Sequence, residues 1–118
     1  MARLGRHAQS NQLANVDACL LDWSQPPDDG TRWPLIVGSD IIYSQAAGEA
    51  LGPSIRGLLA PGGVFLGVLA SYRAGASEAI SSLRREFPGS CRVWQPPARL
   101  WEGLARRNQW VFLKGGYS

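Results

Sequence analysis

Two continuous apolar runs constrain this chain more than any other feature. They are residues 35–38 (LIVG) and residues 64–70 (VFLGVLA). An apolar run without polar alternation is typical of a strand that is buried on both faces, as in a parallel sheet. Between the runs, apolar residues recur at near-helical spacing. Strands that alternate with helices predict an α/β fold with a mostly parallel sheet.

The helical segment between the two runs contains Pro53. Proline suits the first turn of a helix and disrupts its interior. We therefore expect a short helical turn after Tyr43 and a main helix that begins near Pro53. Residues 60–63 (APGG) predict a sharp stop and turn before the second run.

The rest of the chain predicts shorter elements. A strand is expected over residues 16–21, and a second amphipathic helix after residue 70 that ends near Gly89. A brief strand over 92–94, a short helix over 99–106 and a last strand over 109–114 complete the pattern. Because only a loop and a short helix separate the two closing strands, they suit an antiparallel hairpin at the sheet edge.

Length and composition bound the class of protein. The chain has 118 residues, of which 45% are hydrophobic and 18% charged, and this is ordinary for one small globular domain. No apolar run approaches the roughly 20 residues of a membrane span. The N-terminus lacks the apolar core of a signal peptide. We therefore expect a cytoplasmic protein without a membrane partner, with the nucleus as the alternative compartment.

The charged residues, the histidine and the cysteines do not predict a specific binding site. The net charge of +3 comes mainly from arginines in the C-terminal third, which we interpret as solvated surface rather than a nucleic-acid interface. His7 has no Cys or acidic cluster at ligand spacing, so no metal site is expected. Cys19 and Cys91 form no CxxC motif, and two reduced thiols are favoured over a disulfide.

The segment 34–45 (PLIVGSDIIYSQ) places polar residues where the first apolar run ends. In open α/β sheets, ligands bind beyond the carboxyl ends of the strands. A small residue such as Ser39 lets a flat ligand approach the backbone, and Asp40 can accept hydrogen bonds from a cationic group. Tyr43 can point its hydroxyl at the same place. The alternative is that Asp40 caps the next helix and Tyr43 packs on the sheet.

Trp23 stands in a second such motif, Leu-Asp-Trp at residues 21–23, where the predicted strand over 16–21 meets a loop. A tryptophan at the carboxyl end of a strand can stack on a heterocycle such as adenine. Trp23 also fits an ordinary, partly buried core position, and both interpretations stay open on this residue alone.

The two motifs together, with the Pro-Gly-Gly turn, resemble the seven-β-strand S-adenosylmethionine-dependent methyltransferases over about residues 11–114. The likeness is to the lysine methyltransferase-like branch, called methyltransferase family 16. The residues from Asp40 to Tyr43 match that branch's DxxY element. The resemblance implies that Trp23 flanks the adenine of the cofactor and that the backbone of Ser39 contacts it. The Pro-Gly-Gly turn is shared widely among methyltransferases.

The resemblance also implies a truncated fold. The family's Rossmann-like sheet has strand order 3-2-1-4-5-7-6, and its first strands carry a glycine-rich turn and an acidic residue that bind the cofactor. Neither feature is present in residues 1–118, which we expect to be a single partial domain from the C-terminal part of that fold. The inner edge of the strand over 35–38 then lacks its partner, and an uncovered apolar edge favours association.

The function that the resemblance implies is that of a protein-lysine N-methyltransferase, as a fragment or truncated form, with S-adenosylmethionine as cofactor. Asp40 would orient or help deprotonate the lysine ammonium, and Tyr43 would shape the lysine channel. Arg73 and residues 96–107 would face the substrate protein. We expect this chain alone to be inactive.

Two further classes of function remain open. One is a catalytically inactive, methyltransferase-like binding module. The other is a different nucleotide-binding α/β enzyme, such as a dehydrogenase. The sequence argues against the dehydrogenase, because no GxGxxG motif follows a strand and opens a helix.

Overall fold

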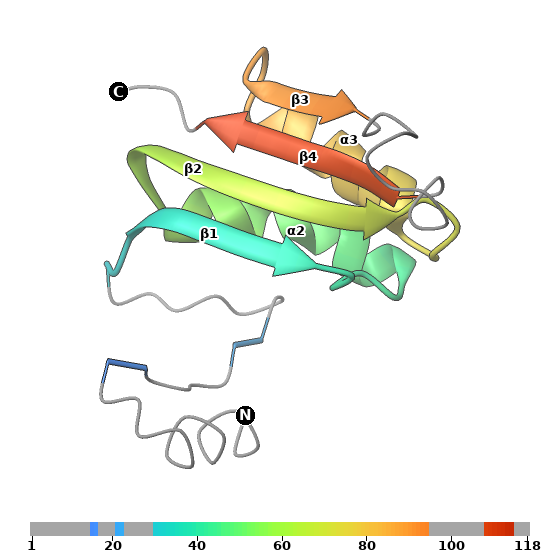
Figure 1. Cartoon of the computed structure of the whole chain (residues 1–118), viewed down its shortest axis with the longest axis horizontal. Coiled ribbons are helices and arrows are strands. Elements are labelled where there is room, and N and C mark those ends of the chain that lie inside the picture. The colour runs from blue at the N-terminus through green and yellow to red at the C-terminus, as the bar shows by residue number, and fades with distance from the viewer. Residues whose placement is uncertain (1–14, 17–20, 23–29, 95–107, 115–118) are drawn as a thin grey trace.

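The structure is a computed structural model that describes residues 15–16, 21–22, 30–94 and 108–114. Its elements are β1 (Trp33–Ser39), α2 (Gln45–Leu58), β2 (Leu59–Ala70), α3 (Ala76–Glu86), β3 (Cys91–Trp94) and β4 (Asn108–Lys114). The strands form a sheet in the order β1-β2-β4-β3, and both helices cover one of its faces (Figure 1). The described residues therefore form a small two-layer α/β domain.

Parallel pairing in this sheet is confined to β1 and β2, whereas β4 runs antiparallel to both β2 and β3. β3 therefore runs in the same direction as β1 and β2, so three of the four described strands share one direction, although most of the hydrogen-bonded pairs are antiparallel. The expected burial on both faces is wrong for β1, where Leu35 and Val37 are exposed because neither described helix covers that face. Residues 95–107, which join β3 to β4, lie outside the described residues, so the closing hairpin is not seen as a connected unit.

Three other expectations also fall on residues outside the described ranges. The strand over 16–21 lies there except at its two ends. The expected helix over 99–106 is wholly outside the described residues, and so is Trp23.

The core lies between the sheet and the two helices. Phe65 from the middle of β2, Leu51 from α2 and Leu83 from α3 are completely buried. The register of the sheet places Val111 opposite Gly67 and Leu113 opposite Phe65, so β4 adds apolar side chains to the same layer. This core holds β1 and β2 in position, and thereby the start of the loop that follows each strand.

Helix α2 continues through Pro53, which corrects the expectation of two helical pieces. The hydroxyl of Ser82, from α3, enters the hydrogen-bond ladder of α2 next to this proline. The Gly52 N–H donates to Ser82 Oγ at 2.9 Å, and that hydroxyl lies 3.0 Å from the Gly48 carbonyl. A hydroxyl from the neighbouring helix thus stands between two groups that an undisturbed α-helix would pair directly.

Gly48 and Gly52 allow α2 and α3 to approach closely. A Cβ added at Gly48 would overlap the carbonyl oxygen of Gly75, and one added at Gly52 would overlap the carbonyl oxygen of Ser82. These two glycines, one helical turn apart, therefore let the backbones of the two helices touch.

The predicted turn over residues 60–63 is a bulge inside β2. β2 already pairs with β1 at Leu59, opposite Trp33, and the register slips before it resumes at Val64, opposite Leu35. Gly62 adopts the left-handed region, with φ of 74°, within this bulge. The turn residues thus interrupt the ladder without ending the strand.

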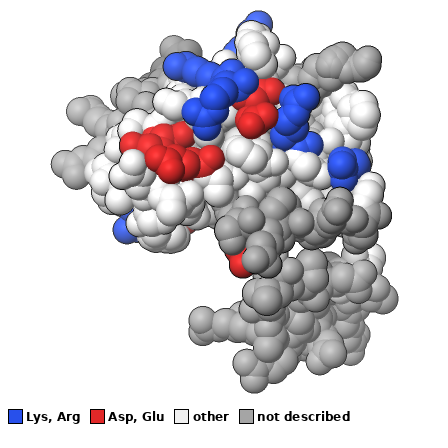
Figure 2. Space-filling view, turned by 180° about the vertical axis from the view of Figure 1, so that it is seen from behind, with Lys and Arg blue, Asp and Glu red and all other residues white. Residues whose placement is uncertain are grey.

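The two faces of the domain differ in polarity. β1 and β2 contain no charged residue, and Leu35, Val37 and Leu66 are exposed on the face that the helices do not cover. Seen from behind, charged side chains gather on the helical side (Figure 2). The charged residues of the two helices are Glu49, Arg56, Glu78, Arg84, Arg85 and Glu86.

Candidate functional site

Asp40 occupies the carboxyl edge of the sheet, directly after β1. Its backbone N–H donates to the Val68 carbonyl of β2 at 2.9 Å, which extends the pairing of the two strands by one residue. Because β1 and β2 are parallel, the loops that follow them leave from the same edge. The side chain of Asp40 therefore lies within reach of the loop after β2.

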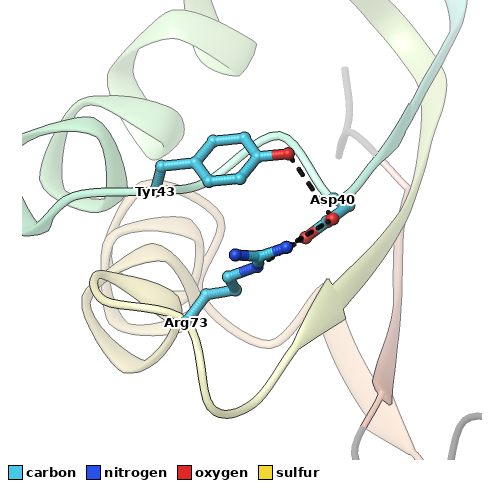
Figure 3. A network of polar contacts seen from close by, with 3 residues as sticks. All are labelled: Asp40, Tyr43 and Arg73. Carbon is cyan, nitrogen blue, oxygen red and sulfur yellow. Dashed lines mark hydrogen bonds and ion pairs between the residues drawn. The ribbon is translucent and has the colours of Figure 1, made fainter.

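Arg73 comes from that loop and binds the Asp40 carboxylate with two hydrogen bonds. Its Nε donates to Oδ1 at 3.3 Å, and its Nη2 donates to Oδ2 at 3.2 Å (Figure 3). The backbone of Arg73 is held by the Ala70 carbonyl at 3.0 Å and by the Ala76 N–H at 3.2 Å. The hydrogen bonding that Arg73 donates to Asp40 is the main cause that raises the pKa of the Arg73 guanidinium.

Tyr43 completes the polar contacts around Asp40. Its hydroxyl donates to Asp40 Oδ2 at 3.4 Å (Figure 3). The loop between them is anchored by Ile42, which is buried in the core. The DxxY spacing thus brings the phenol back to the carboxylate, as the sequence predicts.

The alternative roles for Asp40 and Tyr43 are wrong. The N-cap of α2 is Ser44, whose Oγ accepts a hydrogen bond from the Ala47 N–H at 3.1 Å. Tyr43 is 60% exposed and does not pack on the sheet. Both side chains are therefore available at the surface.

Two aromatic rings flank the Arg73 guanidinium. Its Cζ lies 4.9 Å from the ring centroid of Tyr43 and 5.3 Å from that of Tyr72. Both distances are within the range of cation–π contacts. The Asp40 cluster, as we call Asp40, Tyr43, Tyr72 and Arg73, therefore surrounds one cation with a carboxylate and two rings.

Ser39 borders a hollow on the uncovered face of the sheet. The hollow has a volume of about 300 Å³, and its lining residues are Val37, Gly38, Ser39, Leu66, Gly67, Val68 and Val111. Small residues and aliphatic side chains form this surface. Ser39 thus lies next to Asp40 in the chain and beside an apolar hollow.

A second hollow lies near β3, and Cys91 and Arg84 are among its lining residues. Cys91 is a free thiol. Burial raises the pKa of this thiol, and the nearby Arg84 offsets only part of that rise. Since thiolate is the nucleophilic form of cysteine, Cys91 has the environment of a structural residue.

The structure brings together only some of the residues that the sequence singled out. Asp40 and Tyr43 meet, and Ser39 adjoins them, but Trp23 lies outside the described residues. Arg73, expected to face a substrate protein, binds Asp40, and its contact with a substrate stays a prediction. The sequence motifs do not single out Tyr72, although its ring lies over the Arg73 guanidinium. Its position directly after the second buried strand was the available signal, because parallel strands share a carboxyl edge.

Other kinds of site are not found in the part of the chain that the structure describes. No three His, Cys, Asp or Glu residues gather there in a group that could hold a metal ion. None of the described helices has the length and apolar character needed to span a bilayer.

Comparison with known proteins adds no relative. No profile of a known protein family matches the chain, and no curated protein matches its sequence.

Proposed function

We propose that this chain is the C-terminal portion of an S-adenosylmethionine-dependent protein-lysine N-methyltransferase domain. The observation that carries the proposal is the strand order. The resemblance implies that strands four to seven of such a domain lie in the order 4-5-7-6. The described strands, numbered along the chain, lie in the order β1-β2-β4-β3, which is the same permutation.

The position of the DxxY pair supports the same interpretation. Asp40 and Tyr43 follow β1, the strand that corresponds to strand four, and their side chains are hydrogen-bonded to each other. In this fold class the carboxyl edge of the sheet is where a ligand binds.

The described residues fit one wall of a cofactor site. The hollow beside Ser39, about 300 Å³, is at the lower end of the size range of ligand pockets. Its apolar surface and small residues suit the adenosine half of S-adenosylmethionine. The resemblance assigns the stacking role to Trp23. When bound, the cofactor supplies an electrophilic methyl group.

The chemistry of lysine methylation requires a neutral amine in line with the methyl group, and positioning contributes much of the rate. In this proposal the Asp40 carboxylate orients the lysine ammonium and helps remove its proton. Tyr43, through its hydrogen bond to Oδ2, holds the carboxylate in place. Arg73 must release Asp40 before a lysine can approach it.

A second candidate function is favoured by the same ion pair. Arg73 engages both oxygens of Asp40, so a catalytic carboxylate is already occupied. This arrangement suits a methyltransferase-like binding module without catalysis.

Calorimetric titration with S-adenosylmethionine tests the proposal. We expect a dissociation constant between micromolar and millimolar. This range corresponds to a free energy of binding on the order of −4 to −8 kcal/mol. Ser39→Trp should abolish this binding because the indole fills the hollow. Ser77→Trp, at an exposed position on α3, is the matched control and should leave it intact. Absence of binding by the unaltered chain at millimolar cofactor would overturn the assignment of the hollow beside Ser39 as a cofactor site.

Transfer of a labelled methyl group separates the two candidates. Incorporation into lysine residues of a protein mixture, lost in Asp40→Asn, favours the enzyme. Cofactor binding without incorporation favours the binding module for this chain by itself.

A further inference from the structure

We propose that Asp40, Tyr43 and Tyr72 form a binding site for an alkylammonium cation, and that Arg73 occupies this site as an internal competitor. For its natural ligand, the methylated ammonium of a lysine side chain, the inference rests on the function proposed above. The existence of the cation site and the role of Arg73 do not depend on it.

The hydrogen bonds between Arg73 and the Asp40 carboxylate are long and partly exposed to water. The two hydrogen bonds, at 3.2 and 3.3 Å, are longer than the 2.7–2.9 Å that is usual between a charged donor and a carboxylate. The Asp40 side chain is 43% exposed, and that of Arg73 is 37% exposed. Ion pairs with this exposure are weakened by water and salt. A second cation can therefore displace the guanidinium.

The aromatic side of the site determines which cations it accepts. The faces of Tyr43 and Tyr72 contact the guanidinium, and both rings are about three-fifths exposed, at 60% and 62%. Aromatic rings around a cation are the usual recognition device for methylated ammonium groups. A guanidinium, like an alkylated ammonium, is a weakly hydrated cation. The Arg73 guanidinium that now occupies the site thus indicates that a weakly hydrated cation, such as an alkylated ammonium, fits there.

The walls of the site are fixed independently of the Arg73 side chain. Ile42, buried in the core, and Ser44, the N-cap of α2, hold the backbone on both sides of Tyr43. The loop that carries Tyr72 is held by the backbone hydrogen bonds of Arg73 to residues on either side. Removal of the guanidinium therefore leaves in place the backbone that carries the carboxylate and the two rings.

Titration of Arg73→Gln with tetramethylammonium and with trimethyl-lysine amide tests the inference. Tyrosine ring signals in NMR spectra report binding. If Arg73 fills the site for nine-tenths of the time, its removal tightens the apparent affinity about tenfold. We expect that gain for both probes, and a smaller affinity for unmethylated lysine amide. Circular dichroism checks that the variant is folded.

Arg56→Gln is the matched control. Arg56 also lies over an aromatic ring, 6.0 Å from the centroid of Phe87, and forms an ion pair with Glu86 at 3.8 Å. Its removal changes the net charge equally but lies outside the Asp40 cluster. We expect the affinity for both probes to stay at the level of the unaltered chain.

The double variant Arg73→Gln/Tyr72→Leu should lose the gain, since one of the two rings is then absent. An affinity of Arg73→Gln equal to that of the unaltered chain overturns the inference, as does an equal gain in Arg56→Gln. If Arg73→Gln does not fold, Arg73→Lys replaces it. A single ammonium cannot bind both carboxylate oxygens in the same way, so a smaller gain is expected, and no gain overturns the inference.

The outcomes separate this inference from the proposed function. Cation binding by Arg73→Gln without any binding of S-adenosylmethionine supports the cation site and overturns the cofactor site proposed beside Ser39. Cofactor binding with unchanged cation affinity supports the methyltransferase and removes the internal competitor.

Discussion

Asp40 is under a backbone constraint as well as a chemical one. Its φ of 53° places it in the left-handed region, where it is the only residue other than glycine among those that the structure describes. Asp and Asn tolerate this conformation better than other L residues, and β-branched residues tolerate it worst. The same turn directs the carboxylate to Arg73 and Tyr43, so one residue type satisfies both requirements.

Substitutions at Asp40 should separate the two requirements. Asp40→Asn keeps the tolerance of the backbone and weakens an exposed ion pair, so the free energy of unfolding should fall by less than about 1 kcal/mol. Asp40→Val adds backbone strain and should lower it by about 2 kcal/mol. Urea denaturation followed by circular dichroism measures both values. Equal losses in the two variants would contradict the backbone argument.

The sequence predicts part of the candidate site for a simple reason. Asp40 and Tyr43 are three residues apart, and a contact over that distance depends mainly on the local turn. Arg73 is thirty-three residues from Asp40, and its contact depends on β1 and β2 being neighbours with the same direction. Side-chain pairing across two loops follows from the sheet, which the sequence specifies only in outline.

At the scale of elements, α2 and α3 behave as one unit. Ser82 is fully buried, and its hydroxyl contacts the Gly52 N–H, the Gly48 carbonyl and the Ala79 carbonyl. The hydroxyl has a single proton, so it donates to one of these carbonyls at a time. It thus satisfies the N–H of one helix and shares its proton between both helices.

Removal of this hydroxyl should be costly. Ser82→Ala leaves a buried N–H and a buried carbonyl without their partner, and the free energy of unfolding should fall by about 1–3 kcal/mol. Ser81→Ala is the matched control, because Ser81 is the adjacent residue of α3 and is exposed. We expect a change within about 0.5 kcal/mol there. Thermal or urea unfolding of both variants gives the comparison, and similar values would refute the bridging role.

The sequence locates most elements but misjudges α2. Apolar periodicity predicts α3, and the two apolar runs predict β1 and β2, since these signals depend on neighbouring residues. Pro53 predicts a helix boundary because proline removes a hydrogen bond. Ser82, which contacts the Gly52 N–H and the Gly48 carbonyl beside that proline, is thirty residues from Gly52 in the sequence. No local rule connects the two positions.

At the scale of the described molecule, the helical face is charged (Figure 2), and the part of the opposite face that β1 and β2 form is apolar. β1 lies at the end of the described sheet, and its residues carry no charge. Natural edge strands usually carry charged residues that prevent pairing between molecules. A face and an edge that no other described element covers therefore favour self-association of this chain at high concentration.

A charge on β1 should reduce that association. Val37 is 69% exposed, so Val37→Lys removes little packing and should change the free energy of unfolding by less than about 0.5 kcal/mol. Light scattering as a function of protein concentration should show smaller particles and a higher solubility limit. Ser77→Lys, which adds the same charge to the exposed side of α3, should have a much weaker effect. Equal effects would mean that net charge alone is responsible.

The arrangement of Ser82 has a consequence for the order of folding events. A peptide of residues 45–58 alone lacks the Ser82 hydroxyl that contacts the helix next to Pro53. Such a short, proline-containing peptide should not form one continuous helix in water. Docking of the second helix and completion of the first then become a single cooperative step. The close approach at the two glycines must be reached in the same step, because the hydroxyl enters the ladder only when the backbones touch.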